Sequence, residues 1–307
     1  MNKKLYNNYS DFIKTIFNER VQKISVDAGF SCPNRDGTKA YGGCTYCDNK
    51  TFNPFYCSSQ KTIIEQLNEG IAFFEPKYKT QKYLAYFQAY TNTYADVDTL
   101  KKRYDEALSH NKIVGMVVST RPDCVNKQII DLLNSYTKKY KIFLEFGIES
   151  TNDKTLNYIN RCHTFADTIK AFKLAKNTNL ILGGHLIIGL PGETKQDIIN
   201  HAKKISALPL QTLKLHQLQI IKGTAMAVDY KKNPQKYSLF GIDEYIKITA
   251  EFLSVLNSDI IIERFSSESP RDMLIAPNWG GIKNFELTDK IKKYLKQNNI
   301  YQGINYF

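Results

Sequence analysis

The 307-residue sequence contains no run of eighteen apolar residues, and its first residues, MNKKLYNNYSDF, lack the apolar core of a signal peptide. These absences argue against a membrane-spanning helix and predict a cytoplasmic protein with no membrane partner. Low-complexity linkers and internal repeats are also missing, which argues against a chain of small modules. Because 42% of the residues are hydrophobic, the chain is expected to bury a substantial core.

Arginine is scarce, with 7 arginines beside 35 lysines in a chain whose net charge is +12. Clustered cations bind phosphate by counterion release, so the charge fits a nucleic-acid partner, but AT-rich coding would give the same excess of lysine. Arginine is the more informative cation because its planar guanidinium binds carboxylate and phosphate through two hydrogen bonds. Five arginines occur in segments typical of site loops: Arg35, Arg121, Arg161, Arg264 and Arg271.

Patterns typical of strands alternate with patterns typical of helices. Strands are predicted over 21–29, 83–90, 112–120, 141–150, 180–190 and 212–221. Helices are predicted over 60–75, 97–109, 125–139, 152–159, 164–177, 194–206, 243–256 and 287–298. Crossovers of helical length favour a parallel sheet covered by helices, although the pattern alone does not distinguish an open sheet from a barrel. We expect one structural unit, with a catalytic core over 1–234 and a C-terminal extension over 235–307.

Three of the six cysteines stand close together, in CPNRDGTKAYGGCTYC at 32–47. This segment follows the first predicted strand, at the end of the sheet where α/β proteins build their sites. A structural zinc or an ordinary iron–sulfur site needs four ligands, yet a second CxxC is missing and Cys57 would have to serve as the fourth. Three thiols, from Cys32, Cys44 and Cys47, therefore favour a [4Fe–4S] cluster with one iron open to another ligand, over zinc or chance clustering.

The cysteine segment resembles the cluster loop of the radical S-adenosylmethionine (SAM) superfamily, with a longer first spacer than the usual CxxxCxxC. A long spacer also occurs in relatives of the Elongator catalytic subunit. DAGFSCPNRDGTKAYGGCTYC, taken with YFQAYTNTYA and STRPDC, is similar to the bacterial YhcC/YtqA-type family, over about residues 5–283. The resemblance implies a partial (β/α)6 TIM-type barrel of parallel strands with a C-terminal helical extension. It also implies a [4Fe–4S] cluster, SAM, and an electron donor such as flavodoxin or ferredoxin.

The same resemblance assigns roles to individual residues. Cys32, Cys44 and Cys47 would bind the cluster, and Arg161 in NRCH would pair with the carboxylate of SAM. The remaining SAM-binding candidates lie at the ends of predicted strands or on the cysteine loop: Tyr46 and the glycine-rich Gly189–Leu190 segment near the adenine, Glu149 and His185 near the ribose, and Gln88 and Thr91 near the amino group. The GGE-like segment usual at the second strand is absent here.

STRPD at 119–123 carries the expectation beyond SAM, because Elongator-like enzymes have a similar TRPD and modify C5 of the wobble uridine in tRNA. Arg121 and Asp123 are therefore the candidate catalytic residues, and tRNA is the expected partner. The family resemblance implies remodelling of an aminomethyl-type side chain on that uridine. We expect Arg121, Arg264 and Arg271 to surround the barrel mouth, with Trp279 available for stacking.

Two other functions remain open from the sequence. One is a radical SAM enzyme for a small metabolite or a porphyrin-like substrate, since NRCH and GLPGET also resemble relatives of coproporphyrinogen oxidase. The other is a binding protein, either stapled by zinc or carrying a cluster and SAM without turnover. Formation of 5′-deoxyadenosine separates an enzyme from a binding protein.

Overall fold

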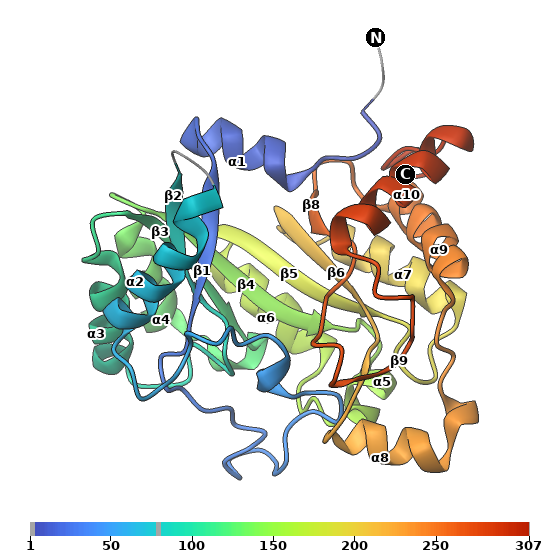
Figure 1. Ribbon diagram of the computed structural model, residues 1–307, viewed down its shortest axis with the longest axis horizontal. Coiled ribbons are helices and arrows are strands. Elements are labelled where there is room, and N and C mark those ends of the chain that lie inside the picture. The colour runs from blue at the N-terminus through green and yellow to red at the C-terminus, as the bar shows by residue number, and fades with distance from the viewer. Residues whose placement is uncertain (1–3, 78–80, 307) are drawn as a thin grey trace.

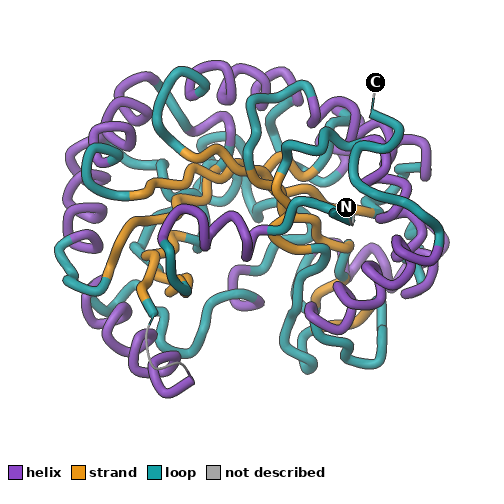
Figure 2. The backbone as a smooth tube through the Cα atoms, turned by 90° about the horizontal axis from the view of Figure 1, so that it is seen from above, coloured by secondary structure: helices purple, strands orange, loops and turns teal. Residues whose placement is uncertain are grey.

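A curled sheet of seven parallel strands forms the centre of the computed structural model, which describes residues 4–77 and 81–306 (Figure 1). The strands lie in the order β1 (Val21–Val26), β2 (Lys82–Phe87), β3 (Ile113–Thr120), β4 (Lys141–Glu149), β5 (Ile181–Ile188), β6 (Thr212–Gln217) and β8 (Ile261–Arg264). All six pairings between neighbours are parallel. Seen from above, helices form an outer arc around an inner arc of strands (Figure 2). The predicted partial barrel is therefore confirmed.

The helices of the outer arc begin at side-chain caps that the sequence supplies. They are α2 (Ile63–Phe74), α3 (Val97–Leu108), α4 (Lys127–Tyr136), α5 (Asp153–Tyr158), α6 (Phe165–Ala175) and α7 (Lys195–Ser206). Thr62, Thr164 and Thr194 each form a capping box with the acidic residue three positions later. Such boxes satisfy backbone N–H groups that the first turn leaves unpaired. All six helices fall where the sequence predicts helices.

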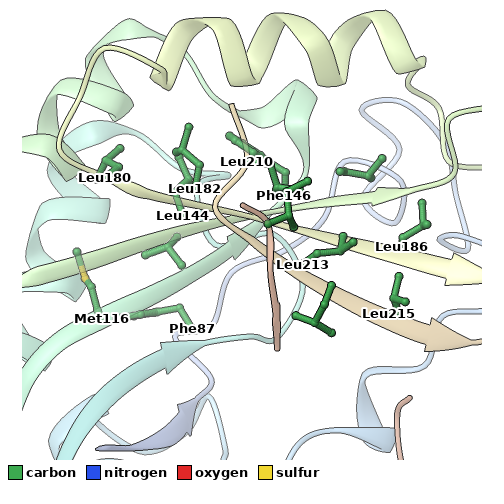
Figure 3. Packing of buried hydrophobic residues seen from close by; sticks show 14 of the residues in the cluster. Phe87, Met116, Leu144, Phe146, Leu180, Leu182, Leu186, Leu210, Leu213 and Leu215 are labelled. Carbon is green, nitrogen blue, oxygen red and sulfur yellow. The ribbon is translucent and has the colours of Figure 1, made fainter. Parts of the chain in front are cut away.

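The layer between the strands and this arc is the main hydrophobic core. Figure 3 shows side chains such as Phe146, Leu182 and Leu210 in that layer. They belong to one cluster of buried residues that includes Phe172 of α6 and Ile198 of α7. This packing covers the outer face of the sheet, and it leaves the inner face free to carry polar groups.

The C-terminal region completes the barrel. It contains α8 (Ala225–Lys232), α9 (Ile242–Val255) and α10 (Asn284–Gln297), as well as β8. Of these three helices, α9 and α10 fall where the sequence predicts helices, and α8 was not predicted. Among the described residues, no helix is both long and apolar enough to cross a bilayer. The boundary between residues 234 and 235 stays a prediction.

Two features of the sheet differ from the prediction. The predicted strand 212–221 is two strands, because the chain leaves the sheet after β6 and β7 (Ile220–Ile221) pairs antiparallel with β9 (Leu274–Ala276). Both pieces are largely buried, and buried Leu218 continues the run between them, so the hydrophobic pattern alone could not separate them. The seventh strand, β8, was not predicted because only four residues form it.

One unpredicted helix, α1 (Tyr9–Phe17), lies across the end of the barrel opposite the loop that follows β1 (Figures 1 and 2). Ile13 of α1 packs against Leu84, Val117 and Phe143 on the inner face of the sheet. Four short 3₁₀ helices lie in the connections, at η1 (Asn49–Thr51), η2 (Glu75–Lys77), η3 (Pro122–Cys124) and η4 (Pro234–Lys236). The helix α1 closes the amino end of the barrel, so the inner face opens at the carboxyl end of the strands.

Candidate functional site

A cavity of about 1310 Å³, its open mouth included, lies at the carboxyl end of the strands. Ten of the thirteen predicted site residues line it: Cys32, Cys44, Tyr46, Cys47, Gln88, Thr91, Arg121, Glu149, Arg161 and His185. Asp123, Gly189 and Leu190 do not line it. Gly189 instead lies beside Phe240, and Leu190 is buried in a separate apolar cluster with Leu156.

The three cysteines are held by a compact loop that follows β1. The Arg35 N–H donates to the Cys32 carbonyl at 2.7 Å, and the Cys47 N–H donates to the Cys44 carbonyl at 3.0 Å. Gly43 has a φ of 85°, and a side chain there would lie 2.9 Å from Nε of Arg35. This position therefore requires glycine, and the tight turn keeps the cysteines on one wall of the cavity.

The wall around the thiols is cationic. Sγ of Cys44 accepts from Nη1 of Arg161 and from Nδ2 of Asn34, each at 3.6 Å, and Nη2 of Arg35 donates to the Cys47 carbonyl at 2.8 Å. Burial, together with the neighbouring Cys44, raises the pKa of Cys47 to about 12. Arg35 and Arg161 oppose this shift, because positive charge favours the thiolate, which is the form that binds metal.

Cys57, the possible fourth ligand, lies elsewhere. Its Sγ donates to the Ser25 carbonyl at 3.0 Å, and it does not line the cavity. Across residues 4–77 and 81–306, no three His, Cys, Asp or Glu side chains converge as they would on a single metal ion. A zinc site needs such convergence, whereas a cluster spreads its ligands over several irons. The cavity is lined by three thiols, those of Cys32, Cys44 and Cys47, and this donor set fits a [4Fe–4S] cluster with one iron open to another ligand.

Beside the cysteines, Glu149 and Arg161 form a buried pair. Nη2 of Arg161 lies 3.5 Å from Oε1 of Glu149 and donates to the Gly147 carbonyl at 2.8 Å. A side chain on Gly147 would come within 2.5 Å of both groups, so only glycine fits. Burial raises the pKa of Glu149 above its usual value, although Arg161 opposes this shift.

The backbone on both sides of this pair is strained. Glu149 has a φ of 64°, and the residues flanking Arg161, Asn160 and Cys162, have φ values of 54° and 56°. Residues other than glycine seldom adopt this conformation, and they do so most often at binding or catalytic sites. The strain aims the two charged side chains into the cavity.

Arg121 and Asp123 form a second buried pair, with Nε and Nη2 of Arg121 each 2.9 Å from a carboxylate oxygen of Asp123. Arg121 also donates to the Arg161 carbonyl at 2.7 Å, and Lys39 on the cysteine loop contacts Asp123. Burial opposes ionisation of Asp123, but Arg121 and Lys39 outweigh it and lower its pKa to about 2. The pair links β3, the cysteine loop and the Arg161 segment, while its predicted catalytic role stays a prediction.

A network of charges on the inner face of the sheet escaped the sequence analysis. Glu145 of β4 accepts from Nζ of Lys23 on β1 at 3.2 Å and from Nζ of Lys214 on β6 at 2.5 Å. Glu263 on β8 lies 2.7 Å from Lys23 and 3.4 Å from Lys214. The predicted site residue His185 joins the network, with Nε2 2.9 Å from Glu145. A charged residue between apolar neighbours inside a strand, as Glu145 in LEF and Lys214 in LKL, is the signal that could have found the network.

Other cavity-lining residues were only partly foreseen. Tyr90, Ser119 and His216 line the cavity without having been predicted. Arg264, expected at the mouth, lies in the cavity wall. Trp279, expected to be free for stacking, packs against Tyr245 at a centroid distance of 4.9 Å and donates to the Phe240 carbonyl.

The chain was compared with known sequences. The sequence profile of the Radical SAM superfamily matches residues 32–205, and that of the Radical SAM C-terminal domain matches residues 210–297. The chain is 36% identical to protein YhcC of Escherichia coli (strain K12) over 277 residues, covering 90% of this chain and 88% of that protein. It is 31% identical to the uncharacterized protein YtqA of Bacillus subtilis (strain 168) over 300 residues, covering 98% and 92%. More distantly, it is 25% identical to the tRNA uridine(34) acetyltransferase of Methanocaldococcus jannaschii over 65% of this chain and 36% of that enzyme.

Among solved structures, the archaeal Elp3 of Methanocaldococcus infernus with an N-terminal deletion has the same fold. Its TM-score is 0.69 at 17% identity, covering 92% of this chain and 64% of that one. The curled parallel sheet and the cysteine loop at the end of its first strand define a partial-barrel protein of the radical SAM type. The chain belongs to the radical SAM superfamily and, within it, to the family of YhcC and YtqA.

Proposed function

We propose that this protein is a radical SAM enzyme that modifies the C5 side chain of the wobble uridine in tRNA. The observation that carries the proposal is one cavity that brings together the three cysteines of the loop and the buried Glu149–Arg161 pair. The three thiols match the ligands of an iron–sulfur cluster. The guanidinium of Arg161 and the carboxylate of Glu149 match the carboxylate and the hydroxyl groups of SAM. An electron donor such as flavodoxin or ferredoxin completes the system.

Cys32, Cys44 and Cys47 would hold three irons of a [4Fe–4S] cluster, leaving the fourth for SAM. When bound and given one electron by the donor, the cluster and SAM would supply the radical chemistry that removes a hydrogen atom from the substrate. Arg161 would pair with the carboxylate of SAM, and Glu149 would accept from its ribose hydroxyls. The cavity wall would shield the reacting groups from part of the bulk water.

The remaining predicted contacts keep their roles within the proposal. Tyr46 lines the cavity beside the cysteines, which suits a contact with adenine. Gln88, Thr91 and His185 also line it. His185 has its Nε2 on Glu145, and burial and Lys214 lower its pKa to about 4, so it would meet the ribose as a neutral group. Gly189 and Leu190 lie outside the cavity, so their proposed contribution is to position the backbone of the β5 end.

Three observations support tRNA as the substrate. A distant relative is a tRNA uridine(34) acetyltransferase, and the fold matches an Elp3. The net charge is +12, which suits a polyanionic partner. A base must leave its stack to reach a buried radical, and anticodon bases are accessible for such displacement.

Nucleoside mass spectrometry of tRNA from a deletion strain tests the substrate. A wobble-uridine nucleoside should be lost and its precursor should accumulate, and the wild-type gene should reverse both changes while a Cys44→Ala gene should not. An unchanged set of wobble uridines would contradict the proposal. In that case, formation of 5′-deoxyadenosine by reduced protein would still distinguish an enzyme with another substrate from a binding protein.

Arg161→Ala is expected to weaken SAM binding by about 1.5–3 kcal/mol, the usual contribution of a hydrogen bond to a charged group. Calorimetry on anaerobic protein measures the change, and the iron content reports whether the cluster is retained. Arg271→Ala is the matched control, because Arg271 is exposed and outside the cavity. Equal SAM affinity in wild type and Arg161→Ala would show that Arg161 only supports the local fold.

A further inference from the structure

Arg264 stands at the end of β8 and lines the same cavity as the cysteines. In the described part of the chain, the side chain of Arg264 makes one hydrogen bond, which Nη2 donates to Nε2 of His216 at 2.7 Å. Its Nε is buried and has no hydrogen-bond partner. A buried guanidinium N–H without a partner is costly, because it has lost its water and gained nothing in exchange.

The other arginines of the cavity have partners of a different kind, although Nη1 of Arg121 is also buried without a hydrogen-bond partner. Arg121 pairs with Asp123, and Arg161 pairs with Glu149. Arg35 donates to the Cys47 carbonyl and lies 5.7 Å from the ring of Tyr90. Within residues 4–77 and 81–306, Arg264 has no carboxylate partner within 4.0 Å. Arg264 is therefore a cation without a carboxylate counter-ion among the described residues.

His216 cannot balance this charge, but it can orient it. Arginine only donates, so Nε2 of His216 is the acceptor and the ring is neutral with its proton on Nδ1. Burial and the nearby Arg264 hold the pKa of His216 well below its usual value. The ring also stacks on His185 at a centroid distance of 5.6 Å, which fixes its plane.

The charged groups near Arg264 form ion pairs with residues other than Arg264. On the inner face of the sheet, Lys23 and Lys214 contact the carboxylates of Glu145 and Glu263. Glu268 also lines the cavity, but its carboxylate accepts from Nζ of Lys283 at 3.1 Å and from the Asn284 N–H at 2.9 Å. Asp48 also lines the cavity, and its carboxylate accepts from the Lys50 N–H at 2.9 Å. None of these carboxylates forms an ion pair with Arg264.

We propose that Arg264, oriented by His216, binds an anionic group of the substrate inside the cavity. The matching chemistry is a carboxylate or a phosphate, which takes two parallel hydrogen bonds from a guanidinium. This inference rests on the proposed function for the identity of the substrate, in which the anion is either a carboxylate on the uridine side chain or a backbone phosphate beside it.

The binding of simple anions tests Arg264 independently of tRNA. Phosphate and acetate are titrated separately into cluster-loaded protein, and the rise in unfolding temperature is measured, since a ligand of the folded state stabilises it. Wild type and Arg103→Gln, a control on α3 outside the cavity, should respond to at least one anion, whereas Arg264→Gln should not. Equal responses in Arg264→Gln and wild type would overturn the inference. Loss of SAM affinity in Arg264→Gln would also overturn it, because the anion bound would then be that of SAM.

Anticodon stem-loops distinguish the two sources of the anion. The first stem-loop carries a C5 carboxymethyl group on the wobble uridine, and the second carries the neutral carbamoylmethyl group at the same place. A third stem-loop has an unmodified wobble uridine with a neutral methylphosphonate in place of the neighbouring phosphate. If the anion is a carboxylate, wild type should prefer the acid over the amide by about tenfold to a hundredfold, and Arg264→Gln should lose the preference. If it is a phosphate, the methylphosphonate should weaken wild type and leave Arg264→Gln unchanged. If no stem-loop binds while the simple anions still do, the proposed function fails and the anion site stands.

Discussion

Cys32→Ala, Cys44→Ala and Cys47→Ala are each expected to abolish binding of the [4Fe–4S] cluster and, with it, reductive cleavage of SAM. All three thiols lie on one loop beside the cavity, and Cys57 is turned away toward the Ser25 carbonyl. Loss of one ligand therefore leaves two thiolates, which are too few to retain the cluster. Anaerobic reconstitution followed by iron and sulfide analysis and visible absorbance measures the loss.

The other three cysteines provide matched controls. Cys57→Ala, Cys124→Ala and Cys162→Ala should all keep the cluster, since none of these residues lines the cavity. Loss of iron in Cys57→Ala would instead identify a fourth cysteine ligand. A cluster with four cysteine ligands has no open iron for SAM, so that result would contradict the proposed chemistry as well.

Glu145→Ala is expected to lower the free energy of unfolding by about 3–5 kcal/mol, the usual effect of removing one partner from a buried ion pair. Glu145 is 1% exposed and contacts Lys23, Lys214 and His185. Burial opposes its charge, but Lys214 and Lys23 hold its pKa well below the usual value. Without the carboxylate of Glu145, the ammonium groups of Lys23 and Lys214 have only Glu263 as a carboxylate partner.

Urea unfolding, followed by circular dichroism, measures this loss. Glu251→Ala on the exposed face of α9 is the control and should change stability by less than about 0.5 kcal/mol. The double variant Glu145→Met, Lys214→Met should lose less free energy of unfolding than the single variants Glu145→Met and Lys214→Met lose together, because the two residues interact directly. Additive losses, or a small loss in Glu145→Ala, would show that the network does not stabilise the fold.

The sequence was sufficient for six of the seven strands of the sheet and for eight of the ten α-helices in the described residues, because strands and helices alternate with clear periods and good caps. It was insufficient for β8, whose four residues carry little periodic signal, and for α1, which lies outside the alternating pattern. The end of β6 was also missed, since Leu218 and Ile220 stay buried after the chain has left the sheet. Hydrophobicity reports burial, and burial does not identify the partner strand.

The candidate site divides in the same way. Cys32, Cys44 and Cys47 could be grouped from sequence because they are neighbours on one loop. The Glu149–Arg161 pair required the resemblance to a family, and its strained backbone was visible only in three dimensions. Arg264 and His216 come from different strands, and no local pattern reports that they touch.

The contacts between the two ends of the described chain have a consequence for the order in which the molecule is assembled. The Gln302 N–H donates to the Leu5 carbonyl, the Asn7 N–H donates to Oε1 of Gln302, and Asn8 pairs with Ile262. During synthesis the first segment must therefore wait for almost the last before these contacts form, whereas the cysteine loop finds its partners earlier in the chain, at Ile159, Arg161 and Met226. Contacts so distant in sequence slow folding and leave sheet edges exposed in the meantime. The wall that carries the thiols can thus assemble before the opposite end of the barrel is closed.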